Sequence, residues 1–241
     1  TQINRMLDRI KVLVQENVNY TGPQAFNNRG GTVRILGGNY NLGAVTGIAT
    51  EELAEAIHIE LGGELTLSNT AGSTNELVWL VNTASTITFL ENANVVANTN
   101  YYFLYTNGYI PNVTMKAGAG FTYTTKRFGF TYGDQRVGNF IMEAGSRLHI
   151  DHNTTESYAA LRVAYLFQMD PGSSATILRT GTAGIPLRLT NANAKAVFNQ
   201  PERVFLYSTA GVPLRFTGAG NLSVTTTAVN VWKSTGWPLA G

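Results

Sequence analysis

Met115-Lys-Ala-Gly118-Ala119 returns as Met142-Glu-Ala-Gly145-Ser146 and returns again, at an equal interval, as Met169-Asp-Pro-Gly172-Ser173. Each phrase places a Gly three positions after a Met, which predicts the same tight turn at the same point of three successive repeats. The interval is about 27 residues, and a period of about 20 to 50 residues is typical of solenoids. In a solenoid each repeat buries its apolar face only by stacking on its neighbours.

A second phrase recurs at nearly the same interval, out of phase with the first. It reads Leu161-Arg-Val163, Leu187-Arg-Leu189 and Leu214-Arg-Phe216. Short alternating runs between Gly, Asn, Pro and Asp indicate strands. The fold class predicted is therefore all-β, a parallel β-helix (solenoid) of about 27 residues per rung. Parallel connections make it right-handed, and a β-propeller is disfavoured because its blades need about 40 residues each.

The domain organisation follows from where these patterns begin and end. Residues 1–22 are predicted to form an amphipathic α-helical cap, which would cover the exposed edges of the first coil. Apolar residues recur there at helical spacing, and Gly22-Pro23 ends the pattern; they are Ile3, Met6, Leu7, Ile10, Leu13 and Val14. The parallel β-helix is predicted over 23–233, and 234–241 is predicted to be a linker or tail.

Alternation along the strands assigns their two faces. We expect Thr122, His149 and Phe205 to point outward. The inward set is expected to include Phe121, Tyr123, Leu148, Ile150, Val204 and Leu206, together with ladders formed by Leu161, Leu187 and Leu214 and by Val163, Leu189 and Phe216.

Composition narrows the classes of function. Charged residues make up 13% of the chain, about half the usual share, and the net charge is only +2. That balance disfavours a nucleic-acid partner. The chain contains no Cys, so disulfides and thiolate metal sites do not stabilise it. No apolar run is long enough to span a bilayer, and no direct membrane insertion is expected.

Catalytic patterns are weak, and we expect no enzyme, no cofactor and no metal site. A calcium-dependent lyase needs several converging carboxylates, whereas the four Asp residues form no close pair. Glu143 and Asp170 occupy equivalent positions of adjacent repeats with Lys116 one repeat earlier, which is typical of a solvated ladder. His149, Asp151 and His152 are the one cluster of metal-ligand types, but in a strand His152 points away from the other two. A polysaccharide lyase or hydrolase remains the alternative.

Two candidate ligand surfaces emerge. The first is a stripe of Arg136, Arg162, Arg188 and Arg215, which recur at nearly the same interval as the two phrases. Apolar neighbours facing inward would place the guanidinium groups outside. Such a row repels itself unless Glu202, Glu156, Asp134 or an anionic ligand compensates. It either covers sheet surface with its aliphatic stems or binds carboxylated or sulfated glycans.

The second candidate surface is aromatic. Tyr and Phe residues crowd two adjacent coils between positions 101 and 132. About half of these should point inward, and the others either stabilise the face of the helix or stack on sugar rings or a protein partner. The candidate ligand-binding residues here are Tyr101, Tyr105, Tyr109 and Tyr132.

Several phrases resemble a known family. "TMKAGAGFTY" (114–123), "FIMEAGSRLHI" (140–150) and "VFNQPERVFLYS" (197–208) are similar to the pectate-lyase-like adhesive domain of Gram-positive surface proteins, over roughly residues 30 to 235. The resemblance implies a right-handed β-helix, extracellular display on the cell wall, and a monomer within a longer multidomain protein. It also implies adhesion to a glycan or an extracellular matrix protein along the side of the rod. It transfers no binding residues, and a ligand-free spacer is a further alternative.

Overall fold

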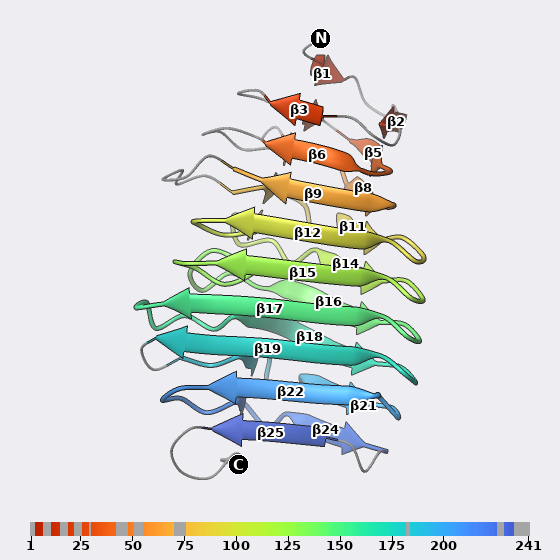
Figure 1. The fold of residues 1–241 in the computed structure, drawn as a ribbon. Coiled ribbons are helices and arrows are strands. Elements are labelled where there is room, and N and C mark those ends of the chain that lie inside the picture. Colours follow the sequence, from red (N-terminus) through yellow and green to blue (C-terminus); the bar gives the residue numbers. More distant parts are fainter. Residues whose placement is uncertain are drawn as a thin grey trace.

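The chain coils into an all-β solenoid, seen in a computed structural model that describes residues 3–6, 11–14, 19–21, 26–28, 30–41, 48–50, 55–69, 76–181, 184–225 and 229–233. Successive turns of the coil stack along one axis from the N-terminal end to the C-terminal end (Figure 1). All the strand pairings are parallel, and they form three sheets along the rod. The predicted parallel β-helix is therefore confirmed.

The three sheets are built from short strands; up to β15 each turn contributes one strand to each sheet, and beyond β13 only the second and third sheets continue in the described residues. The first sheet contains β1 (Ile3–Met6), β4 (Phe26–Asn28), β7 (Ile48–Thr50), β10 (Val78–Trp79) and β13 (Leu104–Tyr105). The second contains β2 (Lys11–Val14), β5 (Gly31–Ile35), β8 (Ile57–Leu61), β11 (Thr86–Phe89), β14 (Asn112–Met115), β16 (Val137–Met142), β18 (Leu161–Met169), β20 (Leu187–Leu189), β21 (Lys195–Phe198), β23 (Leu214–Phe216) and β24 (Asn221–Val224). The third contains β3 (Asn19–Thr21), β6 (Gly38–Asn41), β9 (Glu64–Ser68), β12 (Asn94–Thr99), β15 (Gly120–Thr125), β17 (Arg147–Thr154), β19 (Ser174–Gly181), β22 (Arg203–Ser208) and β25 (Val229–Lys233).

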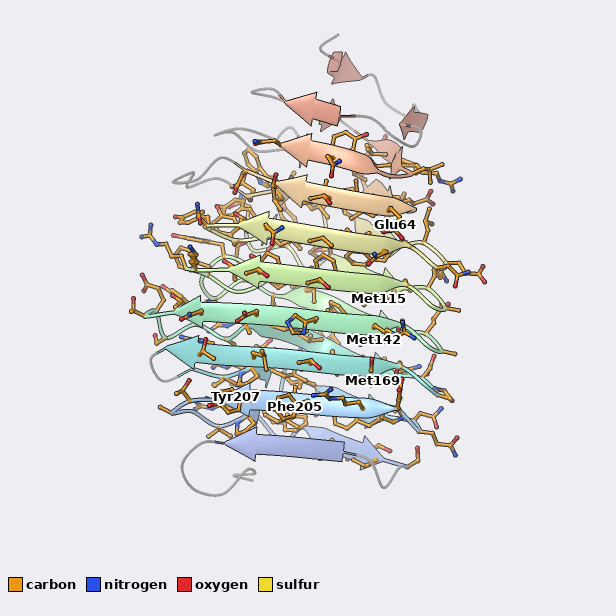
Figure 2. All side chains as sticks on the ribbon, viewed as in Figure 1. Glu64, Met115, Met142, Met169, Phe205 and Tyr207 are labelled. Carbon is orange, nitrogen blue, oxygen red and sulfur yellow. The ribbon has the colours of Figure 1, made fainter. Side chains whose placement is uncertain are left out.

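The strand register confirms the period read from the sequence. Met115 pairs with Met142 and Met142 with Met169, so the three residues stack one above another (Figure 2). The Leu161, Leu187 and Leu214 ladder is also in register, and all three side chains are buried in one continuous core. In Figure 1 the third-sheet strands run to the left in front while second-sheet strands run to the right behind them, the sense of a right-handed coil.

The predicted N-terminal helix is wrong. β1, β2 and β3 pair in parallel with β4, β5 and β6, so strand pairing extends into the segment expected to cap the rod. Strands of three or four residues show too little alternation to be recognised, so the apolar spacing in the sequence imitated a helix. Within the described residues no helix is long and apolar enough to cross a membrane. Residues 234–241, the predicted linker, lie outside the described residues.

The repeated Gly forms the corner between the second and third sheets. Gly118, Gly145 and Gly172 have φ values of 69°, 68° and 71°, and in each turn the following residue donates a hydrogen bond back to the residue two before the Gly. A positive φ at the third position is the geometry of a type II turn, which favours Gly there and accepts Pro171 before it. In the rung before, Asn92 takes this position with φ 54°.

Replacing Gly145 with Ala should therefore lower the free energy of unfolding by about 1–2 kcal/mol. A Cβ at this position has room, since the nearest atom is the Gly118 amide nitrogen at 3.9 Å. The cost then comes from the left-handed backbone alone, and urea unfolding measures it. Asn92→Gly is the matched control in the same column, and it should change stability by less because Asn tolerates this conformation. Equal, negligible effects of both substitutions would contradict the assignment.

Candidate functional site

One outward column of side chains on the rod is aromatic in its first half and cationic in its second. Val78 pairs with Leu104, which bridges to Thr131, while Leu161, Leu187 and Leu214 continue the inward-facing ladder. The Phe130 amide donates to the Ala160 carbonyl at 2.7 Å and joins the two halves. The residues that follow these inward positions point outward. We call them the outer column: Trp79, Tyr105, Tyr132, Arg162, Arg188 and Arg215.

The aromatic half of the outer column is widened into a cluster by rings from neighbouring loops. Tyr132 lies 5.8 Å from Tyr105 and 4.9 Å from Phe128 between ring centroids, and Phe128 lies 5.0 Å from Tyr158. The Arg127 guanidinium lies 5.2 Å from the centroid of the Tyr101 ring. This aromatic cluster consists of Trp79, Tyr101, Tyr102, Tyr105, Phe128, Tyr132 and Tyr158.

Exposure within the aromatic cluster is uneven. Tyr132 is 37% exposed and Tyr101 is half-buried, so these two present ring surface to solvent. Tyr102 is buried and donates its hydroxyl to Glu76 at 2.9 Å. Burial first, and then the Glu76 charge, raise the pKa of Tyr102 far above its usual value. The buried rings form a support on which the exposed rings are held.

Buried polar side chains at the end of the third sheet hold the loops that carry these rings. In register they form a polar ladder of Thr99, Thr125, His152, Arg179 and Ser208. The Thr125 hydroxyl donates to the Tyr101 carbonyl at 3.0 Å, and the His152 Nε2 lies 3.2 Å from the Arg127 carbonyl. These rungs of the polar ladder therefore bind the backbone of the loops that precede β13 and Thr131.

Arg179 is the largest member of the polar ladder and is fully buried. Its guanidinium donates to the carbonyl oxygens of Tyr158 and Thr154, both at 3.1 Å, and to that of Glu156. Burial lowers the pKa of Arg179 to about 10, so the group stays charged at neutral pH. A cation that binds three carbonyls of residues 154–158 fixes the loop that places Tyr158 against Phe128.

Arg162 is buried, which corrects the expectation that the whole stripe is exposed. Residues 132–136 leave the rung after Thr131 and rejoin it at Val137, which pairs with Val163. Asp134 in this excursion forms an ion pair with Arg162, and the Arg162 guanidinium lies 6.0 Å from the Tyr158 ring centroid. Arg162 is left 5% exposed. It connects the aromatic cluster to the arginines and is unavailable as a direct ligand contact.

The remaining arginines of the stripe are accessible, and the Asp134 carboxylate interacts with two of them, Arg136 and Arg188. Arg188 pairs with Arg162 and Arg215 in the register; it is half-buried, whereas Arg136 and Arg215 are exposed. The hydrogen bond and the charge of Arg162 lower the pKa of Asp134, and Arg188 and Arg136 lower it further. Burial, followed by repulsion from Arg162 and Arg215, lowers the pKa of Arg188. An anionic ligand would relieve that repulsion.

The carboxylates that were predicted to compensate the arginine stripe differ in where they lie. Asp134 compensates the stripe as expected, whereas Glu156 lies 3.8 Å from Arg127, and no ion pair joins Glu202 to the stripe among the described residues. Tyr109 is 44% exposed and makes no ring contact with the described part of the chain. The structure therefore brings Tyr101, Tyr105 and Tyr132 together in the aromatic cluster, next to the column of Arg162, Arg188 and Arg215. Tyr109 lies apart from them.

The residues that were weighed as catalytic or metal-binding candidates form surface contacts or are buried in the sheet. Lys116 Nζ lies 2.6 Å from Glu143 Oε1, and Asp170 accepts a hydrogen bond from Gln168 at 2.8 Å. His152 is buried while His149 is half-buried on the opposite face, as alternation predicted. No group of three or more His, Asp or Glu side chains suited to a metal ion is found in the described segments.

Fold and site together define a β-solenoid with one long, mixed aromatic and cationic outer column. Comparison of the chain with protein-family models, curated proteins and solved structures finds no match. The resemblance to adhesive domains therefore stays a prediction.

Proposed function

We propose that the protein is a non-catalytic binding module that holds an anionic glycan along the outer column. The observation that supports this most directly is that one outward column carries the exposed Tyr132 on one side of the buried Arg162 and the accessible Arg188 and Arg215 on the other. Aromatic rings stack on the apolar faces of sugars. Guanidinium groups bind carboxylates and sulfates through paired hydrogen bonds. A polymer lying along the rod axis would meet both.

The spacing of the site suits a repeating ligand. Adjacent strands lie about 4.8 Å apart, so Arg188 and Arg215 are one step apart on a rigid sheet, and the buried Arg162 separates them from Tyr132. Rigid presentation limits the conformational entropy lost on binding. The resemblance to Gram-positive adhesive domains supports display outside the cell, within a longer surface protein.

Charge reversal at the cationic half tests the proposal. Arg188→Glu combined with Arg215→Glu should weaken binding to sulfated or uronate-containing glycans about a hundredfold or more, because each lost charge-assisted contact is worth about 1.5–3 kcal/mol. A glycan array followed by titration calorimetry measures it. Arg203→Glu is the matched control, because Arg203 is exposed on the third sheet. Unchanged binding in the double variant, or release of unsaturated sugar products by the wild-type protein, would contradict the proposal.

A further inference from the structure

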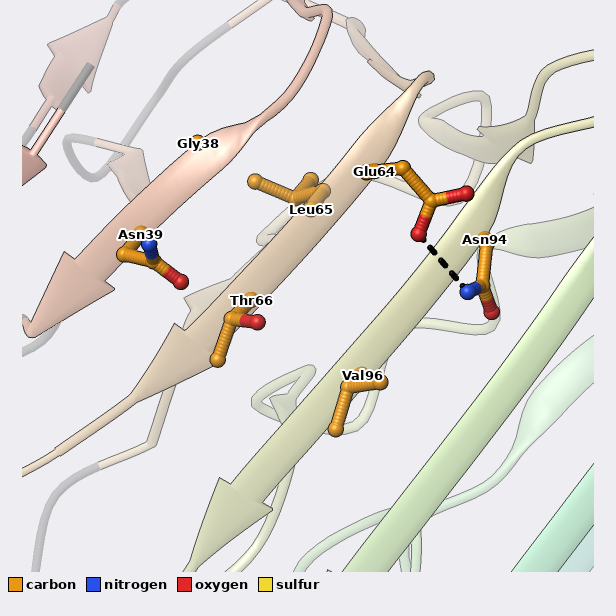
Figure 3. Close-up of a pocket in the computed structure, with 7 residues that line it drawn as sticks. All are labelled: Gly38, Asn39, Glu64, Leu65, Thr66, Asn94 and Val96. Carbon is orange, nitrogen blue, oxygen red and sulfur yellow. Dashed lines mark hydrogen bonds between the residues drawn. The ribbon is translucent and has the colours of Figure 1, made fainter. Parts of the chain in front are cut away.

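A shallow groove crosses the outward face of the third sheet, away from the outer column. At one end it is lined by Gly38, Glu64 and Asn94 (Figure 3). It continues from Asn94 past Gly120 to Ser174. The two hollows share Asn94, and we call them together the third-sheet groove, which spans β6 to β19 along the rod axis. At about 4.8 Å per strand, six strands make it roughly 24 Å long.

The lining of the third-sheet groove consists mainly of neutral hydrogen-bonding groups. Glu64 and Arg147 lie in different parts of the groove and balance each other in charge, and Asn94 Nδ2 donates to Glu64 Oε2 at 2.8 Å. Gly38 and Gly120 contribute no side chains and deepen the floor. The other polar lining residues are Asn39, Thr66, Asn92, Thr122, His149, Ser174 and Thr176.

The column of Thr122, His149 and Thr176 continues into an aromatic platform. Thr176 pairs with Phe205 and Leu178 with Tyr207, so the two rings follow the groove on the same outward face (Figure 2). They are half-buried, tilted only 14° from one another, and 6.4 Å apart between centroids. The Arg203 guanidinium lies 5.0 Å from the centroid of the Phe205 ring. Near-parallel, half-exposed rings offer a flat stacking surface.

We infer that the third-sheet groove is a second binding site, for an extended neutral glycan whose chain lies along the rod and whose end stacks on Phe205 and Tyr207. Amide and hydroxyl side chains exchange hydrogen bonds with sugar hydroxyls. Glu64 and Arg147 cancel in charge within the groove lining. Arg203 beside Phe205 adds one cation at the aromatic end, in contrast to the row of guanidinium groups on the outer column. A peptide strand would seek a free sheet edge, and these strands are already paired on both sides. Charge and hydrogen-bonding chemistry therefore favour a neutral glycan as the occupant.

Affinity electrophoresis with soluble xylan, mixed-linkage β-glucan and galactomannan tests the inference on the full chain. We expect retardation by at least one of these, weakened tenfold or more by Gly120→Gln and by Phe205→Ala. Gly120→Gln adds a side chain to the groove at a position where its Cβ fits at the limit of ordinary contact, 3.4 Å from Asn94 Oδ1 and 3.7 Å from the Ala93 carbonyl oxygen. Its melting temperature should match that of the wild type. Tyr132→Ala is the matched control, since it removes an exposed ring of the outer column.

Several outcomes would overturn the inference. They are retardation by none of the three polysaccharides, retardation that survives both groove substitutions, and retardation lost only in Tyr132→Ala. The last would place neutral-glycan binding on the outer column. Binding of acidic glycans by the Gly120→Gln variant should stay at the wild-type level, which keeps this test separate from the proposed function.

Discussion

We expect the replacement of Arg179 with Met to lower the free energy of unfolding by about 3 kcal/mol or more. Each buried unsatisfied acceptor costs about 1–3 kcal/mol. Met fills much of the volume but donates no hydrogen bonds, so the carbonyls of Thr154, Glu156 and Tyr158 lose their shared donor. The variant no longer has to bury a charged guanidinium, and this gain offsets part of the loss. We therefore expect a value at the lower end of the sum over the three carbonyls.

The effect of Arg179→Met should extend to the candidate site. Once residues 154–158 are released, Tyr158 is no longer held 5.0 Å from Phe128, and the near-ultraviolet circular dichroism of the aromatic cluster should weaken. Urea unfolding gives the stability change. Arg147→Met, an exposed Arg on β17 of the same sheet, is the control and should change stability by less than about 0.5 kcal/mol. A near-wild-type midpoint for Arg179→Met would show that the loop is held by other contacts.

The period made most of the fold predictable, because stacked rungs must repeat their turns and their inward residues. The Met and Leu ladders and the corner glycines follow from that constraint and are found by spacing alone. The aromatic half of the outer column obeys it too. Trp79, Tyr105 and Tyr132 recur at the same interval as the arginines, although only the arginines were predicted to form a column.

Prediction from the sequence failed where the rung length changes. The interval from Tyr132 to Arg162 is longer than the period of the other rungs, because residues 132–136 leave the sheet and return. Because of this excursion, the sequence interval does not reveal that Tyr132 and Arg162 belong to one column. The excursion also places Asp134 against Arg162. The burial of Arg162 therefore depends on a loop whose path no periodicity encodes. The polar ladder was missed for a related reason, since alternation assigns a face but not the carbonyl partners that make a buried Arg tolerable.

We expect His152 to lower the free energy of unfolding as the pH falls, in addition to the effect of the protein's carboxylates. The side chain is fully buried, pairs in register with Arg179 and lies above Thr125. Burial, followed by repulsion from Arg179, lowers the pKa of His152 to about 3. In the unfolded chain the pKa is about 6.5. Between these values the unfolded state binds a proton that the native state excludes, so protonation favours unfolding.

The size of the His152 effect follows from proton linkage. Stability attributable to His152 is complete above about pH 6.5 and decreases by about 1.4 kcal/mol per pH unit below it, until the native group titrates near pH 3. From about pH 6 to about pH 4.5 the loss is about 2 kcal/mol. Urea unfolding at several pH values should therefore show a shallower slope for His152→Gln, while His149→Gln, on the outward face, keeps the wild-type slope. Identical slopes in all three proteins would mean that His152 is protonated in the native state. Arg179 would then have to tolerate a second buried cation in the next rung, and the polar ladder would need an anionic partner.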